Sequence, residues 1–173
     1  MVFKLAVFSS QALISQQAQA ISELLKMNDL SCRYGLLLTL AQAEDLVNTR
    51  SIALADCGRI EPGIGVMGKL IEVFCDSQYL NADNYAESLN ELIEIFYYLK
   101  AEPREMHMPD GIISDDDIIS GMKKAFETIC QGSLELLAHR EGVKIARSFF
   151  CDYEPDFDED HNHERSYLDD WTE

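Results

Sequence analysis

Basic residues are scarce in this chain. It holds 14 Lys and Arg against 31 Asp and Glu in 173 residues, a formal net charge of −17. That charge repels the phosphates of nucleic acids and of anionic lipid surfaces, so neither is an expected partner. No apolar run approaches the ~20 residues of a membrane-spanning helix. The apolar start at residues 5–8 is also too short for a secretion signal, because Ser9 and Ser10 interrupt it. We therefore expect a cytoplasmic protein.

Sequence patterns for disulfide, metal and catalytic chemistry are also missing. The five cysteines are odd in number and form no C-x-x-C pair, which favours reduced thiols in the core over a disulfide framework. The zinc-protease pattern H-E-x-x-H and the hydrolase pattern G-x-S-x-G do not occur. No catalytic residue and no cofactor is predicted, and we expect a protein that is not an enzyme.

One short stretch, EPGIGVMGKL at residues 61–70, matches two nucleotide-binding patterns. Its three glycines spell G-x-G-x-x-G, and the same stretch spells most of a phosphate-binding loop. The dinucleotide pattern needs a buried β-strand directly before the glycines, because the strand aims backbone N–H groups at the pyrophosphate. The preceding residues, CGRIEP, include charges and a proline, and Leu70 stands where Ser or Thr would bind magnesium. We therefore interpret the glycines as a turn entered from a helix or a loop.

Five segments carry the apolar spacing of amphipathic helices. They cover residues 15–27, 40–54, 64–74 and 85–99 and a fifth segment that begins after Ser114. Thr39 and Ser114 are predicted N-caps, and Asp117 is the capping-box partner of Ser114. The fifth helix is expected either to reach His139 or to break near Gly132. The pattern predicts an all-α protein, a single bundle of about five helices.

Two features leave alternatives open. The strings VFKLAVF at residues 2–8 and CRYGLLLT at residues 32–39 also fit strands, so a small N-terminal hairpin packed on the helices, an α+β fold, is the second interpretation. The helix over residues 85–99 carries Ile93, Tyr97 and Tyr98 beside its main apolar stripe. A central buried helix and a helix that contacts a second copy of the chain both explain this wider face.

The composition changes at Cys151, so we divide the chain into a helical domain, residues 1–150, and an acidic tail, residues 151–173. The tail holds ten Asp or Glu and one Arg. Four of its side chains could bind zinc, nickel or copper weakly: Asp158, Asp160, His161 and His163. A solvated tail explains the same composition. The interleaved aromatic residues fit a third alternative, docking on a basic, apolar groove.

Four strings resemble an uncharacterised family of small bacterial proteins, a domain of unknown function. They are YGLLLT at residues 34–39, GRIEPG at 58–63, FCDSQYL at 74–80 and CQGSLELL at 130–137. The resemblance spans roughly residues 34–147. It implies a single cytoplasmic domain and transfers no activity, ligand or catalytic residue.

The sequence therefore favours a protein-interaction module, with another protein or a second copy of the chain as partner. An alternative is a small-ligand site or an enzyme around Arg59 and Glu61, with Asp76, Gln131 and Ser133 behind them. For Arg59 and Glu61, a salt bridge or hydrogen bonds that hold the loop are the competing explanation. Metal binding by the tail is the third hypothesis.

Overall fold

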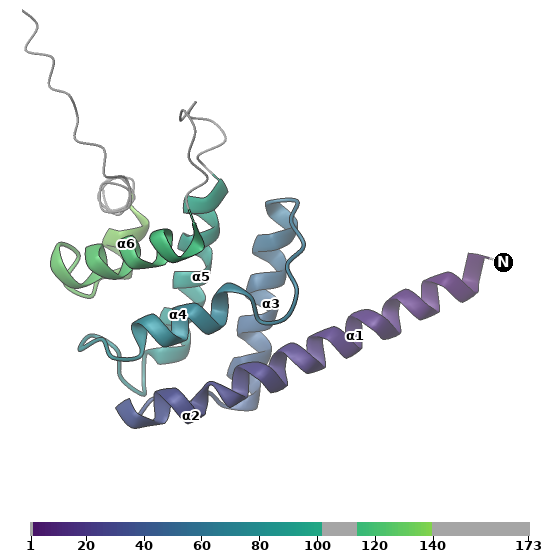
Figure 1. Ribbon diagram of the computed structural model, residues 1–173, viewed down its shortest axis with the longest axis horizontal. Helices are drawn as coiled ribbons and strands as arrows, with labels where there is room; N and C mark the ends of the chain where they lie inside the picture. The colour runs from purple at the N-terminus through teal and green to yellow at the C-terminus, as the bar shows by residue number, and fades with distance from the viewer. Residues whose placement is uncertain (1, 102–113, 140–173) are drawn as a thin grey trace, which may run out of the picture.

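The computed structural model describes residues 2–101 and 114–139, with the backbone alone for residues 2–13. In these ranges every regular element is a helix (Figure 1). The elements are α1 (Val2–Lys26), α2 (Asn28–Ser31), the 3-10 helix η1 (Cys32–Tyr34), α3 (Leu40–Asp56), α4 (Val66–Phe74), α5 (Tyr85–Ala101), α6 (Asp115–Thr128) and α7 (Leu134–Ala138). The prediction of an all-α fold is confirmed. The five predicted helices correspond to α1, α3, α4, α5 and α6.

Helix α5 lies at the centre of the molecule and packs against α3, α4, α6 and α7. Leu92 and Phe96 are fully buried, and Ile93 and Tyr97 are nearly so. Tyr98 remains 52% exposed. Because the neighbours of α5 cover most of its circumference, its wide apolar face is explained by a central position in one chain.

Side-chain caps and a turn set the ends of the outer helices. Thr39 accepts a hydrogen bond from the backbone of Gln42 at the start of α3, and Ser114 accepts one from the backbone of Asp117 at the start of α6. Both predicted N-caps are therefore confirmed. The predicted fifth helix breaks: α6 ends at Thr128, and α7 begins after a turn at Gly132. A Cβ at Gly132 would clash with the ring of Tyr79, which packs on this turn.

The alternative with an N-terminal hairpin is wrong. Residues 2–8 belong to α1, and residues 32–34 form η1. The apolar string does run on in an extended connection, where Leu36 and Leu38 are buried and Leu37 is 59% exposed. This alternation is typical of a strand, but the side chain of Asn28 bonds both the N–H of Leu38 (2.8 Å) and its carbonyl oxygen (2.9 Å). An amide side chain thus takes the place of a neighbouring strand.

The cysteines follow the sequence expectation only in part. Cys75 and Cys130 are buried free thiols, Cys57 is half-buried and Cys32 is exposed. The expectation of a core position is therefore wrong for Cys32. None of the helices in the described ranges has the length and apolar character to cross a membrane.

Helix α1 extends well beyond the other helices (Figure 1). Residues 14–19 are all exposed, and the first buried side chain of α1 is Ala20, followed by Leu24. The body of the protein therefore covers only the last turns of this helix.

The central position of α5 predicts unequal costs for two substitutions on the same helix. Leu92→Ala should destabilise the protein by about 2–5 kcal/mol, because it removes a fully buried side chain and leaves a cavity. Glu94→Ala, at an exposed position two residues away, should change the free energy of unfolding by about 0.5 kcal/mol or less. Urea denaturation measures both. Similar values for the two variants would contradict the assignment of α5 as the core helix.

Candidate functional site

The glycine-rich loop joins α3 to α4 and receives its chain from a helix. Helix α3 ends at Asp56, the N–H of Arg59 bonds the carbonyl oxygen of Leu54, and no strand precedes Gly63 within the described residues. Lys69, which would contact phosphates in a phosphate-binding loop, forms a 2.6 Å ion pair with Asp116 on the outside of the molecule. The interpretation of this stretch as a turn entered from a helix or loop is confirmed.

A buried arginine holds this loop against α3. Arg50 is 5% exposed, and its Nη1 donates to the carbonyl oxygen of Gly63 at 2.9 Å. Its Nη2 donates to the carbonyl oxygen of Glu61 at 3.2 Å and reaches the Glu61 carboxylate at 3.5 Å. The loop passes so close to the guanidinium that a Cβ at Gly65 would lie 2.6 Å from Nη2. Gly65 also has φ +49°, so both the lack of space for a side chain and the backbone conformation favour glycine at this position.

The Glu61 carboxylate extends the contact to two further helices. Tyr97 of α5 donates its hydroxyl to Glu61 Oε2 at 2.8 Å, and Lys100 Nζ lies 3.3 Å from Oε1. Lys100 also pairs with Asp115 of α6 at 2.7 Å. We call these five side chains the Arg50–Glu61 cluster: Arg50, Glu61, Tyr97, Lys100 and Asp115. It carries two positive and two negative charges and joins α3, the glycine loop, α5 and α6.

The pKa values within the cluster follow from burial and these partners. Burial acts to raise the pKa of Glu61, but the Tyr97 hydroxyl, Lys100 and Arg50 outweigh it, so the net pKa is lowered. Burial and the hydrogen bond to Glu61 raise the pKa of Tyr97. Both groups are therefore held in the state that the hydrogen bond requires, a carboxylate that accepts and a phenol that donates. The geometry is that of a network of hydrogen bonds and ion pairs that links the helices.

The five candidate ligand residues do not converge on one site. Glu61 is engaged in the cluster, whereas Arg59 is half-buried, and its side chain forms no hydrogen bond or ion pair in the part of the chain described. Asp76, after α4, pairs with Lys123 of α6 at 2.6 Å. Gln131 lies exposed in the α6–α7 turn, and Ser133 caps α7 by accepting from the backbone of Leu136.

The candidate metal ligands of the tail lie outside the described residues: Asp158, Asp160, His161 and His163. Among the residues that are described, no three His, Cys, Asp or Glu side chains are grouped so that they could hold a metal ion. The acidic tail as a whole, residues 151–173, also lies outside the described ranges.

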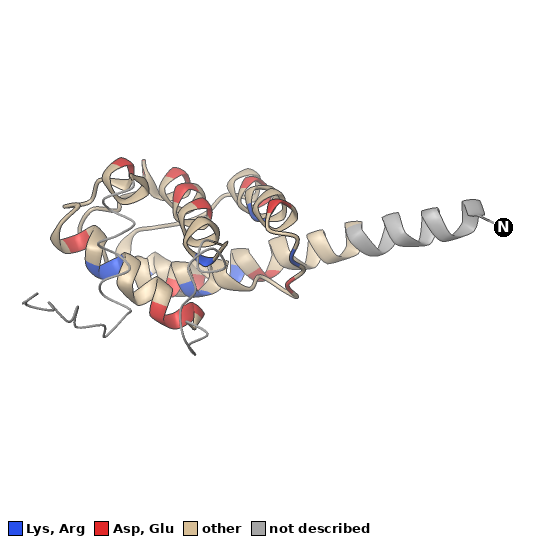
Figure 2. Cartoon of the chain, turned by 90° about the horizontal axis from the view of Figure 1, so that it is seen from above, with Lys and Arg blue, Asp and Glu red and all other residues tan. Residues whose placement is uncertain are grey.

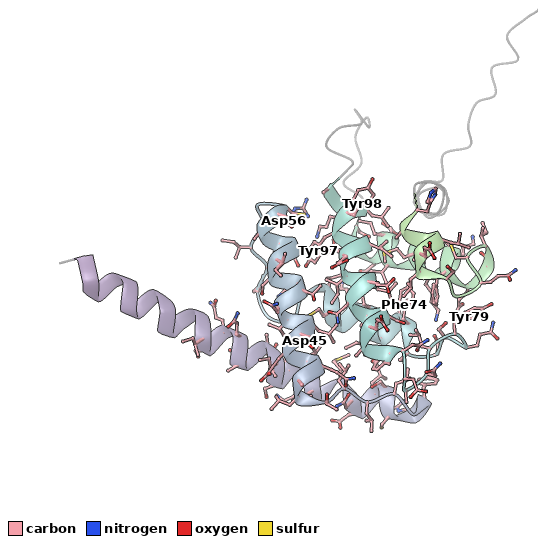
Figure 3. All side chains as sticks on the ribbon, turned by 180° about the vertical axis from the view of Figure 1, so that it is seen from behind. Asp45, Asp56, Phe74, Tyr79, Tyr97 and Tyr98 are labelled. Atoms are coloured by element: carbon pink, nitrogen blue, oxygen red, sulfur yellow. The ribbon has the colours of Figure 1, made fainter. Side chains whose placement is uncertain are left out.

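A surface groove runs between α3 and α5, and sequence reasoning did not find it. The two helices run in the same direction and lie side by side (Figure 3). The groove is lined by α3 residues 42, 45, 49, 52 and 56 and by α5 residues 87, 91, 94, 98 and 101. These positions recur every three or four residues, so they form one face on each helix. We call this surface the α3–α5 groove.

The two halves of the α3–α5 groove differ in character. The half at the C-terminal ends is a pocket of about 430 Å³ where Ile52 and Tyr98 are 55% and 52% exposed. The other half is a pocket of about 420 Å³ with a mainly polar lining. Glu94 lines both pockets, so the two adjoin along the same pair of helices.

Acidic residues dominate the charge of the groove. Six carboxylates line it: Asp45, Asp56, Asp83, Glu87, Glu91 and Glu94. No Lys, Arg or His is among the described residues of the lining. Burial, together with the nearby charges of Glu87 and Glu94, raises the pKa of Glu91. The negative ends of both helix dipoles lie at the apolar half, so the electrostatic potential favours cations there as well.

Two sequence signals could have located these features. Arg50 falls on the buried stripe of α3 with Ala43, Leu46, Val47 and Leu54, and a charged residue on an apolar stripe needs a partner. The acids Glu87, Glu91 and Glu94 recur at helical spacing on the outer face of α5. That they face a second acidic helix depends on how α3 packs, which no local pattern reveals.

The Arg50–Glu61 cluster predicts a pH-dependent loss of stability for Glu61→Gln. The neutral amide leaves Arg50 and Lys100 short of a charged acceptor, so the variant should be destabilised by about 1–2 kcal/mol near neutral pH. Because folding lowers the pKa of Glu61, its contribution is present above the usual glutamate pKa of ~4.3 and is lost as the pH falls through the folded value. The difference between wild type and variant should therefore shrink in acid. Urea titrations at neutral pH and at about pH 3 measure it.

Asp76→Asn provides the control, because it removes a carboxylate whose side chain is 57% exposed in its ion pair. It should cost about 0.5 kcal/mol or less. Equal losses for the two variants, or a Glu61→Gln loss that persists undiminished in acid, would contradict the role assigned to the cluster.

Comparison with known proteins places the chain in a family. A family model described as a family of unknown function (DUF6323) matches residues 23–155. This range includes the resemblance seen over residues 34–147, and it holds the Arg50–Glu61 cluster and the α3–α5 groove. No curated protein gives a significant match, and neither does any solved structure. Because the model matches well over half of its length, the chain belongs to the DUF6323 family of unknown function.

Proposed function

We propose that this protein is a non-enzymatic, cytoplasmic interaction module of a bacterial cell, and that its α3–α5 groove binds a basic amphipathic helix of a partner protein. The observation that carries the proposal is the lining of the groove. Six carboxylates face it, no basic side chain is among its described residues, and Ile52 and Tyr98 expose apolar surface at one end. A helix with lysines or arginines beside an apolar face complements both properties.

The dimensions of the groove suit a helix. Its α3 side extends from residue 42 to residue 56, which corresponds to ~21 Å at the α-helical rise, or about 14 residues of a bound helix. An amphipathic helix placed in a groove is a recurrent mode of protein recognition, with apolar residues as anchors. Here Ile52 and Tyr98 would receive the anchors at the C-terminal ends of α3 and α5.

The electrostatics support a cationic partner. Burial raises the pKa of Glu91, and the neighbouring carboxylates of Glu87 and Glu94 add to the shift, because like charges disfavour one another. A bound cation would relieve this repulsion and steer association. The same charges make nucleic acids and anionic membranes poor partners.

A small-ligand site around Arg59 and Glu61 has less support. Glu61 already bonds Tyr97 and Lys100 within the Arg50–Glu61 cluster, and Arg59 does not join it. The interaction hypothesis is therefore the one that the arrangement of the described side chains favours.

The proposal is tested with a labelled helical peptide of about 14 residues, made of Leu on one face and Lys on the other. Fluorescence anisotropy with the full chain should show saturable binding that weakens as salt is added. The double variant Glu91→Gln/Glu94→Gln should bind about fivefold more weakly, as expected for two charge contacts of ~0.5 kcal/mol each. Ile52→Ser should also weaken binding, because it removes the exposed apolar contact.

The matched control is Glu72→Gln/Glu135→Gln, which removes the same charge from exposed positions on α4 and α7. It should leave peptide binding nearly unchanged. A peptide with Glu in place of Lys should not bind. Equal weakening by the two double variants would show that net charge alone attracts the peptide. That result would contradict the assignment of the α3–α5 groove as the binding site.

A further inference from the structure

The N-terminal part of α1 is a helix without a covering partner in the described structure. Helix α1 has 25 residues, and the first buried side chain described along it is Ala20. We call residues 2–19 the projecting half; at the α-helical rise it is ~27 Å long. Ile14 is 64% exposed there, and the backbone continues away from the other helices toward the N-terminus (Figure 1). Most of the stability of a helix in a protein comes from the packing of its apolar face.

The sequence of the projecting half has the pattern of a helix that packs against another helix. Phe3, Val7, Ile14 and Ile21 fall on one face at helical spacing, and this face reaches the body at Ile21, which is partly buried against the core. A helix with such an apolar stripe gains stability mainly by burying it.

The charge of this segment sets it apart from the rest of the chain. Residues 1–22 contain Lys4 and no Asp or Glu, and no longer stretch of the sequence lacks an acid. The chain as a whole has a net charge of −17, and the described body shows Asp and Glu on most of its helices (Figure 2). The net charge of the rest of the chain therefore opposes association of two copies, whereas this segment does not add to that repulsion.

We propose that two copies of this chain form a dimer by pairing the projecting halves of α1 in antiparallel orientation. Full overlap of residues 2–19 places the two-fold axis near Ser10, where Val7 of each copy opposes Ile14 of the other. Antiparallel pairing puts the acidic bodies at opposite ends of the paired helices, whereas parallel pairing would bring them side by side. The interface is independent of the α3–α5 groove.

The oligomeric state of the full chain tests this proposal. Size-exclusion chromatography with light scattering should give twice the chain mass of 19.6 kDa for the wild type. Ile14→Glu should raise the dimer dissociation constant by at least about tenfold, because it buries an unpaired carboxylate between the helices. Gln16→Glu adds the same charge at an exposed position on the opposite face of α1, and this variant should remain dimeric. Both positions are exposed in the single chain, so folding is not at risk.

Orientation is tested by cross-linking. A photoreactive phenylalanine analogue at Phe3 should attach to the partner copy near Ala18, within the tryptic peptide that ends at Lys26. Attachment to the peptide that ends at Lys4 would show parallel pairing and overturn the antiparallel arrangement. A wild-type chain that has the single-chain mass throughout a dilution series would overturn the dimer. If that single chain also sediments with phosphatidylcholine vesicles, the apolar face of α1 binds lipid instead, and the dimer is overturned in that case too. A dimer unaffected by Ile14→Glu would place the interface elsewhere and overturn it as well.

Discussion

A guanidinium group placed inside the protein constrains much of this fold. Arg50 lies on the buried stripe of α3, and a buried charge is tolerated only when its donors are bonded and its charge is compensated. The chain after α3 meets this requirement for the two Nη atoms by curling back, so that carbonyl oxygens of Glu61 and Gly63 accept from them, while Nε has no partner among the described residues. The Glu61 carboxylate supplies the negative charge, and Tyr97 and Lys100 then connect it to α5. One buried arginine thus determines the course of the glycine loop and joins α3 to α5.

The Arg50–Glu61 cluster also helps to explain the α3–α5 groove, which lies on the other side of the two helices. Toward the N-terminal ends, Leu46 of α3 packs with Leu89 and Ile93 of α5 in the interior, while the Arg50–Glu61 cluster holds the C-terminal ends. Two helices held in parallel leave a groove between them on their outer side. The cations in the cluster are used internally, and Lys69 and Lys123 are paired with acids outside the groove, Asp116 and Asp76. The carboxylates of the α3–α5 groove therefore have no basic neighbour among the described residues that line the groove.

Sequence reasoning succeeded where the signal is local. Thr39 and Ser114 begin helices as predicted, because an N-cap depends on side-chain chemistry within three residues. It failed at residues 32–39, where the alternating burial of Leu36 and Leu38 is real but Asn28 provides the hydrogen bonds of a strand partner. Of the candidate site residues, Glu61 does lie in a polar cluster, yet its partners come from positions 11 to 39 residues away along the chain. Such partners depend on helix packing, which the spacing of residues within one helix does not encode.

The groove and the projecting half of α1 differ in how they relate to the family. The family match begins at residue 23, so it includes the groove, whereas the projecting half precedes it. Binding in the groove would thus use residues inside the range that the family model matches, and pairing through α1 would use residues outside it. An antiparallel α1 pair would carry the two bodies at its opposite ends, each with its own α3–α5 groove. A partner with two basic helices could then bind both grooves at once, and its second contact would form at the high effective concentration that the first contact creates. The segment without carboxylates, residues 2–19, would in this way increase the avidity of the acidic groove.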